Sequence, residues 1–171
     1  MDFSAFPLLV GVFTVLVILY VTYLISREGV GPDGMVRIAD RIRVGTKAYL
    51  NRQFKTIVWF IPLLAVAIHL FLGWKTAVTF VAGSFLSLLT AYIGMNVVVK
   101  ANVRTANMAT KSSSRAFRIA LLGGSVMGFC VTGLSLIGLY IFYVLFRDPE
   151  VLVGFGFGAS LAAIFAQIGG G

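Results

Sequence analysis

The stretch "TIVWFIPLLAVAIHLFLGWKTAVTFVAGSFLSLLTAYIGMNVVV", residues Thr56–Val99, holds one formally charged side chain, Lys75. On each side of Lys75 the chain stays uncharged for about 20 residues, the length that a helix needs to cross the hydrocarbon core of a bilayer. The connection around Gly73 and Trp74 is only a few residues long. We therefore expect two antiparallel transmembrane helices, over 56–74 and 76–99, joined as a hairpin.

Three further uncharged stretches cover 7–25, 119–146 and 151–171. The whole chain is 59% hydrophobic and 12% charged, whereas a soluble domain carries about 25% charged residues. The first stretch has no basic residue before it, so it does not resemble a signal peptide and is expected to stay as a span. The sequence therefore predicts an all-α polytopic membrane protein with five transmembrane helices, in one unit over 1–171.

The basic residues lie mainly in two of the connections, 26–55 and 100–118. These connections hold Arg27, Arg37, Arg41, Arg43, Lys47, Arg52, Lys55, Lys100, Arg104, Lys111, Arg115 and Arg118. The positive-inside rule places both connections in the cytoplasm and the N-terminus outside. We expect a multi-pass protein of the cell membrane or another energy-coupling membrane, with the lipid bilayer as its partner. The net charge of +8 is thus a signal of topology, not of nucleic-acid binding.

The segment after the first span begins with the turn residues Gly31 to Gly34 and continues with apolar residues near helical spacing. Two interpretations stay open. The segment 31–55 could lie on the lipid headgroups as an interfacial helix, or it could extend into the cytoplasm and pack on the rest of the molecule.

Small residues recur four positions apart in three places. Such spacing lets two helices approach closely in lipid and predicts helix contacts at Gly124/Gly128, Gly154/Gly158 and, more weakly, Gly83/Ser87.

Little chemistry is visible in the spans. All six acidic residues lie outside them, and no phosphate loop, metal-ligand spacing or nucleophile–base pair occurs. No catalytic, cofactor-binding or metal-ligating residue is assigned. His69 and Asn96 are expected to form hydrogen bonds between helices. Gln167, the only amide of the last stretch, is either an interhelical hydrogen-bonding group or a functional residue.

Four segments, taken in order, resemble the membrane-integral inorganic pyrophosphatases, which pump ions with the energy of pyrophosphate hydrolysis. They are "IADRIRVGTKAYLNRQFKTI" (38–57), "YIGMNVVVKANVRTANMA" (92–109), "FRIALLGGSVMGFCVTGLSLIGL" (117–139) and "GFGFGASLAAIFAQIGGG" (154–171). The second and fourth are the more specific.

This resemblance implies that the chain is the N-terminal part of a sixteen-helix, homodimeric pump. The intact protein would couple hydrolysis of Mg²⁺-pyrophosphate to export of H⁺ or Na⁺, with Mg²⁺ as cofactor and K⁺ as a second candidate. The lysines and aspartates that hold the substrate in this family would follow Gly171. The resemblance also makes Gln167 an ion-coupling candidate, since many family members carry an arginine there. A neutral amide cannot form the ion pair of that arginine.

Two other functions are considered. The chain could be a complete, non-catalytic small polytopic protein or accessory subunit, because it lacks catalytic residues and presents glycine-rich helix faces. It could also be a small-molecule transporter of another fold, although the spans offer few polar residues beyond Ser, Thr and Asn96.

Overall fold

The computed structural model describes residues 6–170, with side chains described up to Ile164. This part of the chain consists of helices joined by short connections and contains no strand, which confirms the predicted all-α class. Its elements are α1 (Phe6–Ser26), α2 (Asp33–Leu72), α3 (Trp74–Ala109), α4 (Ser113–Phe146), the short 3-10 helix η2 (Pro149–Val151) and α5 (Leu152–Gly170).

Four of these helices, α1 to α4, are long and apolar enough to cross a membrane. The helices α1, α3 and α4 each contain one of the predicted uncharged stretches, and α2 contains 56–72 of the stretch 56–74, because Gly73 ends the helix. The fifth predicted span falls on η2 and α5, whose described apolar part, Pro149–Ile164, is shorter. The polytopic, membrane-embedded architecture follows from these lengths and compositions.

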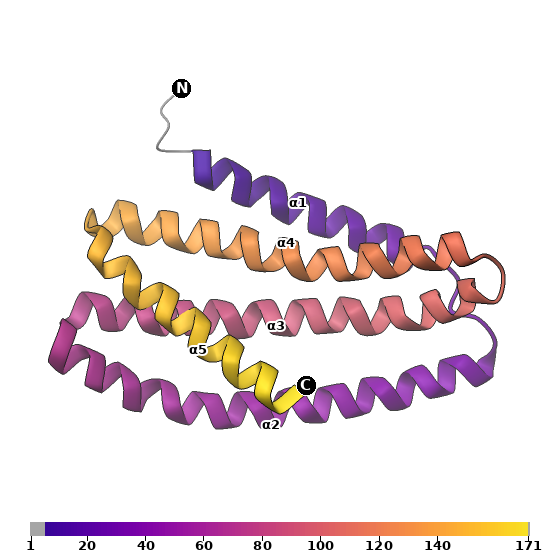
Figure 1. Cartoon of the computed structure of the whole chain (residues 1–171), viewed down its shortest axis with the longest axis horizontal. Coiled ribbons are helices and arrows are strands. Elements are labelled where there is room, and N and C mark those ends of the chain that lie inside the picture. Colours follow the sequence, from indigo (N-terminus) through magenta and orange to yellow (C-terminus); the bar gives the residue numbers. More distant parts are fainter. Residues whose placement is uncertain (1–5, 171) are drawn as a thin grey trace.

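The long helices lie side by side in the order α1, α4, α3, α2, and α5 crosses them obliquely (Figure 1). The helix α3 is central, because it packs against α4, α5 and α2. In Figure 1, α5 starts at the far end of α4 and runs across α3 until its C-terminal end lies against the middle of α2. We call the end of the bundle that carries the α1–α2 and α3–α4 connections the basic end.

The segment 33–55 is not a separate interfacial helix. It continues without interruption into the second span, so that α2 has 40 residues and a length of about 60 Å at 1.5 Å per residue. Leu50 of this segment is buried, and α2 packs along α3. The interfacial interpretation is therefore wrong, and the extension that packs on the molecule is what the structure contains.

Two tight reversals set the direction of the helices. Only Gly73 separates α2 from α3, and its φ of +92° is a conformation that favours glycine. At the end of α4, Arg147 takes a φ of +50° and its N–H donates to the Tyr143 carbonyl. Asp148 then accepts a hydrogen bond from the Glu150 N–H at 3.1 Å, which starts η2 and turns the chain into α5.

The packing within the described residues is concentrated around α3. One buried cluster joins α1, α3 and α4 through Ile18, Val21, Ile25, Val97, Ala101, Val126 and Cys130. The outer surface, by contrast, carries large apolar side chains: Trp59 and Phe71 of α2 are 81% and 86% exposed. A surface of this kind is one that a bilayer or further helices cover.

Candidate functional site

The predicted ion-coupling residue, Gln167, lies in the last turns of α5. Its side chain lies outside the described residues, so the site is defined by how α5 is held. Five residues before it, Ala162 is buried in a cluster with Ile57 of α2 and Leu88 of α3. The helix segment that bears Gln167 therefore leaves a three-helix junction and runs toward the basic end of the bundle (Figure 1).

A row of glycines lets α5 lie directly on α3. A Cβ added to Gly158 would collide with the Phe80 carbonyl oxygen, and one added to Gly83 would collide with that of Phe155. A Cβ on Gly154 would likewise collide with the Thr76 carbonyl. We call this contact, formed by Gly83, Gly154 and Gly158, the α3–α5 seam.

Two hydroxyl groups of α3 lock the α3–α5 seam in register. Thr79 Oγ1 donates to the carbonyl of Val151, the last residue of η2, at 2.7 Å, and Ser84 Oγ shares its proton between the Gly158 carbonyl at 3.2 Å and the Phe80 carbonyl of its own helix at 2.9 Å. Both side chains are fully buried. Because a helix in lipid has no water with which to exchange such bonds, they define how far α5 can slide along α3.

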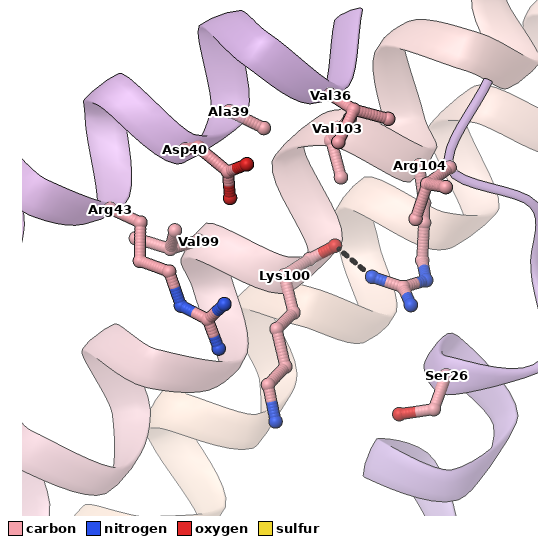
Figure 2. A pocket seen from close by; sticks show the side chains of 10 residues that line it. Ser26, Val36, Ala39, Asp40, Arg43, Val99, Lys100, Val103 and Arg104 are labelled. Carbon is pink, nitrogen blue, oxygen red and sulfur yellow. Dashed lines mark hydrogen bonds between the residues drawn. The ribbon is translucent and has the colours of Figure 1, made fainter. Parts of the chain in front are cut away.

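Closer to the basic end, α3 forms a looser contact with α2. At the basic end the two helices and the α1–α2 connection enclose a cavity of about 320 Å³, which we call the α2–α3 cavity. Figure 2 shows that charged side chains project into it from both helices. It is lined by Ser26, Val30, Val36, Ala39, Asp40, Arg43, Val99, Lys100, Val103 and Arg104.

Arg104 is the anchored cation of this cavity. Its Nη1 donates to the Lys100 carbonyl at 2.8 Å (Figure 2), and its Nε donates to the Glu28 carbonyl at 3.1 Å. Partial burial lowers the pKa of the Arg104 guanidinium from its ordinary value. The side chain still carries its charge at any physiological pH, so its main effect is to bind the α1–α2 connection to α3.

The α1–α2 connection is held at a second point by Asn107. Its Nδ2 donates to the Gly29 carbonyl at 2.8 Å, and the side chain is buried. Gly31, with a φ of +86°, passes so close that an added Cβ would lie 2.9 Å from Asn107 Oδ1. The sequence analysis did not single out Asn107; its place in a polar, charged segment gave no signal of burial.

The described residues do not form a magnesium site. Among them no three His, Cys, Asp or Glu side chains come together in a way that could hold a metal ion. The acidic residues Glu28, Asp33 and Asp40 lie near the basic end, whereas Asp148 and Glu150 lie at the far end of α4. A Mg²⁺-pyrophosphate centre needs several converging carboxylates, and this donor set does not fit it.

The structure tests several of the residues predicted from the sequence. Gly154, Gly158 and Gly83 do form close helix contacts, whereas Gly124 and Gly128 have no atom near an added Cβ within the described part of the chain. The expected interhelical bond of Asn96 is wrong, since its Nδ2 donates to the Tyr92 carbonyl one turn back in the same helix. His69 is exposed near the end of α2.

The fold and its apolar surface define a polytopic helical membrane protein. The sequence model of one family, described as "Inorganic H+ pyrophosphatase", matches residues 12–171, nearly the whole chain. The chain belongs to this family. The resemblance drawn from the four sequence segments is thereby confirmed.

Individual relatives agree with the family. The chain is 44% identical over 169 residues to a K(+)-insensitive pyrophosphate-energized proton pump of Moorella thermoacetica, covering 94% of this chain and 25% of that protein. It is 41% identical over 171 residues to a putative K(+)-stimulated pyrophosphate-energized sodium pump of Clostridium tetani, covering 99% and 25%. A proton pump of Methanosarcina mazei is 43% identical over 149 residues, covering 86% and 22%. The chain thus spans about a quarter of the length of these relatives.

Proposed function

We propose that this chain is the N-terminal quarter of a pyrophosphate-energised ion pump, which couples hydrolysis of Mg²⁺-pyrophosphate to export of H⁺ or Na⁺. The observation that carries the proposal is the family match over residues 12–171, together with relatives that are named as such pumps. The relatives include both proton and sodium pumps, so the family alone leaves the choice of ion to experiment.

In this proposal the chain does no hydrolysis by itself. The Mg²⁺ and pyrophosphate ligands belong to the part of the pump that the chain does not span, and we expect a homodimer as the working form. The contribution of the chain is to hold α5 in place, through the α3–α5 seam in its first half and the Ile57–Leu88–Ala162 cluster further along the helix.

Gln167 is proposed as a residue that couples hydrolysis to ion movement. Its support is its position, in the last turns of a helix that is rigidly packed for most of its length and that heads toward the basic end. A neutral amide can donate and accept hydrogen bonds without carrying the fixed charge that an arginine would bring. The Gln167→Arg variant should therefore change the ratio of ions moved to pyrophosphate hydrolysed more than the rate of hydrolysis.

The proposed orientation places the basic end in the cytoplasm and the N-terminus outside. Its support is the concentration of Lys and Arg in the two connections at that end. Single cysteines at Ser114 and at Asp148, introduced into a Cys130→Ser background, should be labelled from opposite sides by a membrane-impermeant maleimide. Labelling of Asp148→Cys only from the cytoplasm would contradict the orientation.

The function is tested on the full-length pump in inside-out membrane vesicles. We expect Mg²⁺-dependent release of phosphate from pyrophosphate, and either acidification of the lumen or uptake of ²²Na⁺. An uncoupler should abolish the first signal and leave the second intact, which distinguishes the two ions. Vesicles that contain the protein at a measured amount yet release no phosphate would contradict the proposal, and the non-catalytic membrane protein would then be the better description.

A further inference from the structure

A second cavity at the basic end lies between α1 and α4, away from the α2–α3 cavity. Its volume is about 450 Å³, and we call it the α1–α4 cavity. In Figure 1 the C-terminal end of α1 runs alongside the start of α4, where this cavity lies. It is lined by Leu24, Ile25, Arg27, Glu28, Arg115, Arg118, Ile119 and Leu122.

The charges of the α1–α4 cavity are unbalanced. Three guanidinium groups, from Arg27, Arg115 and Arg118, line it with a single carboxylate, that of Glu28. Among the residues that the structure describes, none of these three arginines forms an ion pair with a carboxylate within 4.0 Å, and Arg27 instead lies 5.7 Å from the ring centroid of Tyr23. These three arginines are exposed side chains, and the single carboxylate beside them leaves the cavity with an excess of positive charge.

The start of α4 makes this region more positive. Arg115 and Arg118 occupy the first two turns of the helix, whose first turn holds no acidic residue. The unpaired N–H groups of a helix N-terminus already attract anions, and cations there are unfavourable unless an anion is present. An anion placed beside Arg115 and Arg118 would therefore be favoured both by the two guanidinium groups and by the helix N-terminus.

The cavity also lies where the apolar parts of both helices begin. Ile25 and Ile119 are buried in the protein core; the uncharged, predicted transmembrane part of α1 ends at Ile25, and that of α4 begins at Ile119. The arginines and Glu28 lie on the other side of this boundary. A ligand that fits both the charged part and the apolar part of the cavity has a phosphate group attached to an apolar tail. Basic pockets between transmembrane helices are known to bind lipid headgroups of this kind.

We propose that the α1–α4 cavity binds the headgroup phosphate of an anionic phospholipid. Arg27, Arg115 and Arg118 donate N–H groups to the phosphate oxygens, while Leu24 and Leu122 contact the glycerol and the first methylenes. A free phosphate or pyrophosphate ion shares the phosphate chemistry but leaves the apolar half of the cavity without a partner. The site goes beyond the proposed pumping activity and does not depend on it.

The experiment uses the full-length protein in nanodiscs that contain phosphatidylcholine with a minor share of phosphatidylglycerol. Native mass spectrometry counts the phosphatidylglycerol molecules that stay bound when the nanodisc is removed. We expect one retained molecule per chain at this site, and a roughly 10- to 30-fold weaker retention in the Arg115→Gln/Arg118→Gln double variant, at about 1 kcal/mol per arginine. The matched control is Arg37→Gln/Arg41→Gln, which removes two exposed cations of the same end that line neither cavity.

Equal loss of phosphatidylglycerol in both double variants would overturn the proposal, because it would show a general surface attraction. A second arm titrates inorganic phosphate into protein in nanodiscs of phosphatidylcholine alone and follows the unfolding temperature. If millimolar phosphate stabilises the wild type but not Arg115→Gln/Arg118→Gln, the ligand is a free anion and the lipid assignment is wrong. The unfolding temperatures without added ligand show whether either variant has lost its fold.

Substitution of Glu28 should change the retention of phosphatidylglycerol in the opposite direction. Its carboxylate repels a bound phosphate, so Glu28→Gln should strengthen the retention of phosphatidylglycerol by several-fold. Weaker retention in Glu28→Gln would mean that the carboxylate takes part in binding, as it would for the ammonium group of a zwitterionic lipid, and would overturn the choice of an anionic one. Pyrophosphate hydrolysis in detergent serves only to confirm that each variant is intact.

Discussion

The helix α3 packs against both α5 and α2, and the two contacts are built differently. At the contact with α5 the two backbones touch: Gly83 of α3 and Gly154 and Gly158 of α5 leave no room for a methyl group. Two buried hydroxyl groups of α3 fix the position of α5 along it. Against α2, at the basic end, it leaves the α2–α3 cavity and a second hollow of about 160 Å³ next to it. The comparison teaches that α5, the helix that carries the ion-coupling candidate, meets α3 backbone to backbone at its glycines, although a hollow of about 220 Å³ lined by Gly83 and Phe155 also borders this contact.

The largest expected effect follows from adding one methyl group to the α3–α5 seam. Gly158→Ala places its Cβ against the Phe80 carbonyl, a backbone atom that cannot rotate away. We expect a loss of about 2–3 kcal/mol in the free energy of unfolding, as for other overpacked sites. Thermal unfolding of the purified pump, together with its rate of pyrophosphate hydrolysis, provides the measurement.

The control for this change lies two residues away on the same helix. Nothing within 4 Å surrounds an added Cβ on Gly156, so Gly156→Ala should be neutral or stabilise α5 by up to about 1 kcal/mol through its better helix propensity. Similar losses of unfolding free energy in Gly156→Ala and Gly158→Ala would show that α5 is sensitive to any change, and would contradict the special role of the α3–α5 seam.

The next effect concerns the hydroxyl groups of the seam. Thr79→Val keeps the shape of the side chain but removes its bond to the Val151 carbonyl, which should lower the unfolding temperature by an amount equivalent to about 1 kcal/mol. Thr132→Val is matched, because its hydroxyl bonds only to Gly128 of its own helix and is exposed. The idea fails if Thr132→Val lowers the unfolding temperature as much as Thr79→Val.

A more local effect is expected where the α1–α2 connection meets α3. Asn107→Ala removes the bond to the Gly29 carbonyl, and the global stability should fall by less than about 1 kcal/mol. Amide hydrogen exchange in residues 27–32 should nevertheless rise clearly, while exchange in α5 stays unchanged. The control is Asn102→Ala, which removes an exposed amide earlier in α3. It should change neither the global stability nor the hydrogen exchange of residues 27–32.

The smallest effect is expected for added bulk in the loose contact. Ala39 borders both hollows between α2 and α3, so Ala39→Leu can extend into existing space. We expect a change within about 0.5 kcal/mol of zero, the range of ordinary surface substitutions. A loss of unfolding free energy as large as that of Gly158→Ala would mean that the α2–α3 contact tightens in the assembled pump. The contrast between the α2–α3 contact and the α3–α5 seam would then disappear.

Much of the fold could be predicted from the sequence, for a physical reason that is visible residue by residue. The length of Thr56–Val99 and the position of Lys75 require two spans, since a bilayer tolerates neither charge nor unpaired backbone. The four-residue spacing of Gly154 and Gly158 likewise identified one face of α5 that packs closely. The same spacing at Gly124 and Gly128 gave no contact within the described residues, because spacing alone does not name the partner helix.

What the sequence by itself determined is the class, the apolar stretches that form α1 to α4 and the membership of the pyrophosphatase family, since these depend on composition, run length and ordered motifs. Only the tertiary structure decided that 33–55 continues the second span, that α5 crosses α3 toward α2, and that three arginines of two helices share one cavity. These features depend on contacts between side chains that lie tens of residues apart in the sequence. Helical periodicity describes one helix at a time, whereas a seam or a cavity exists only between two.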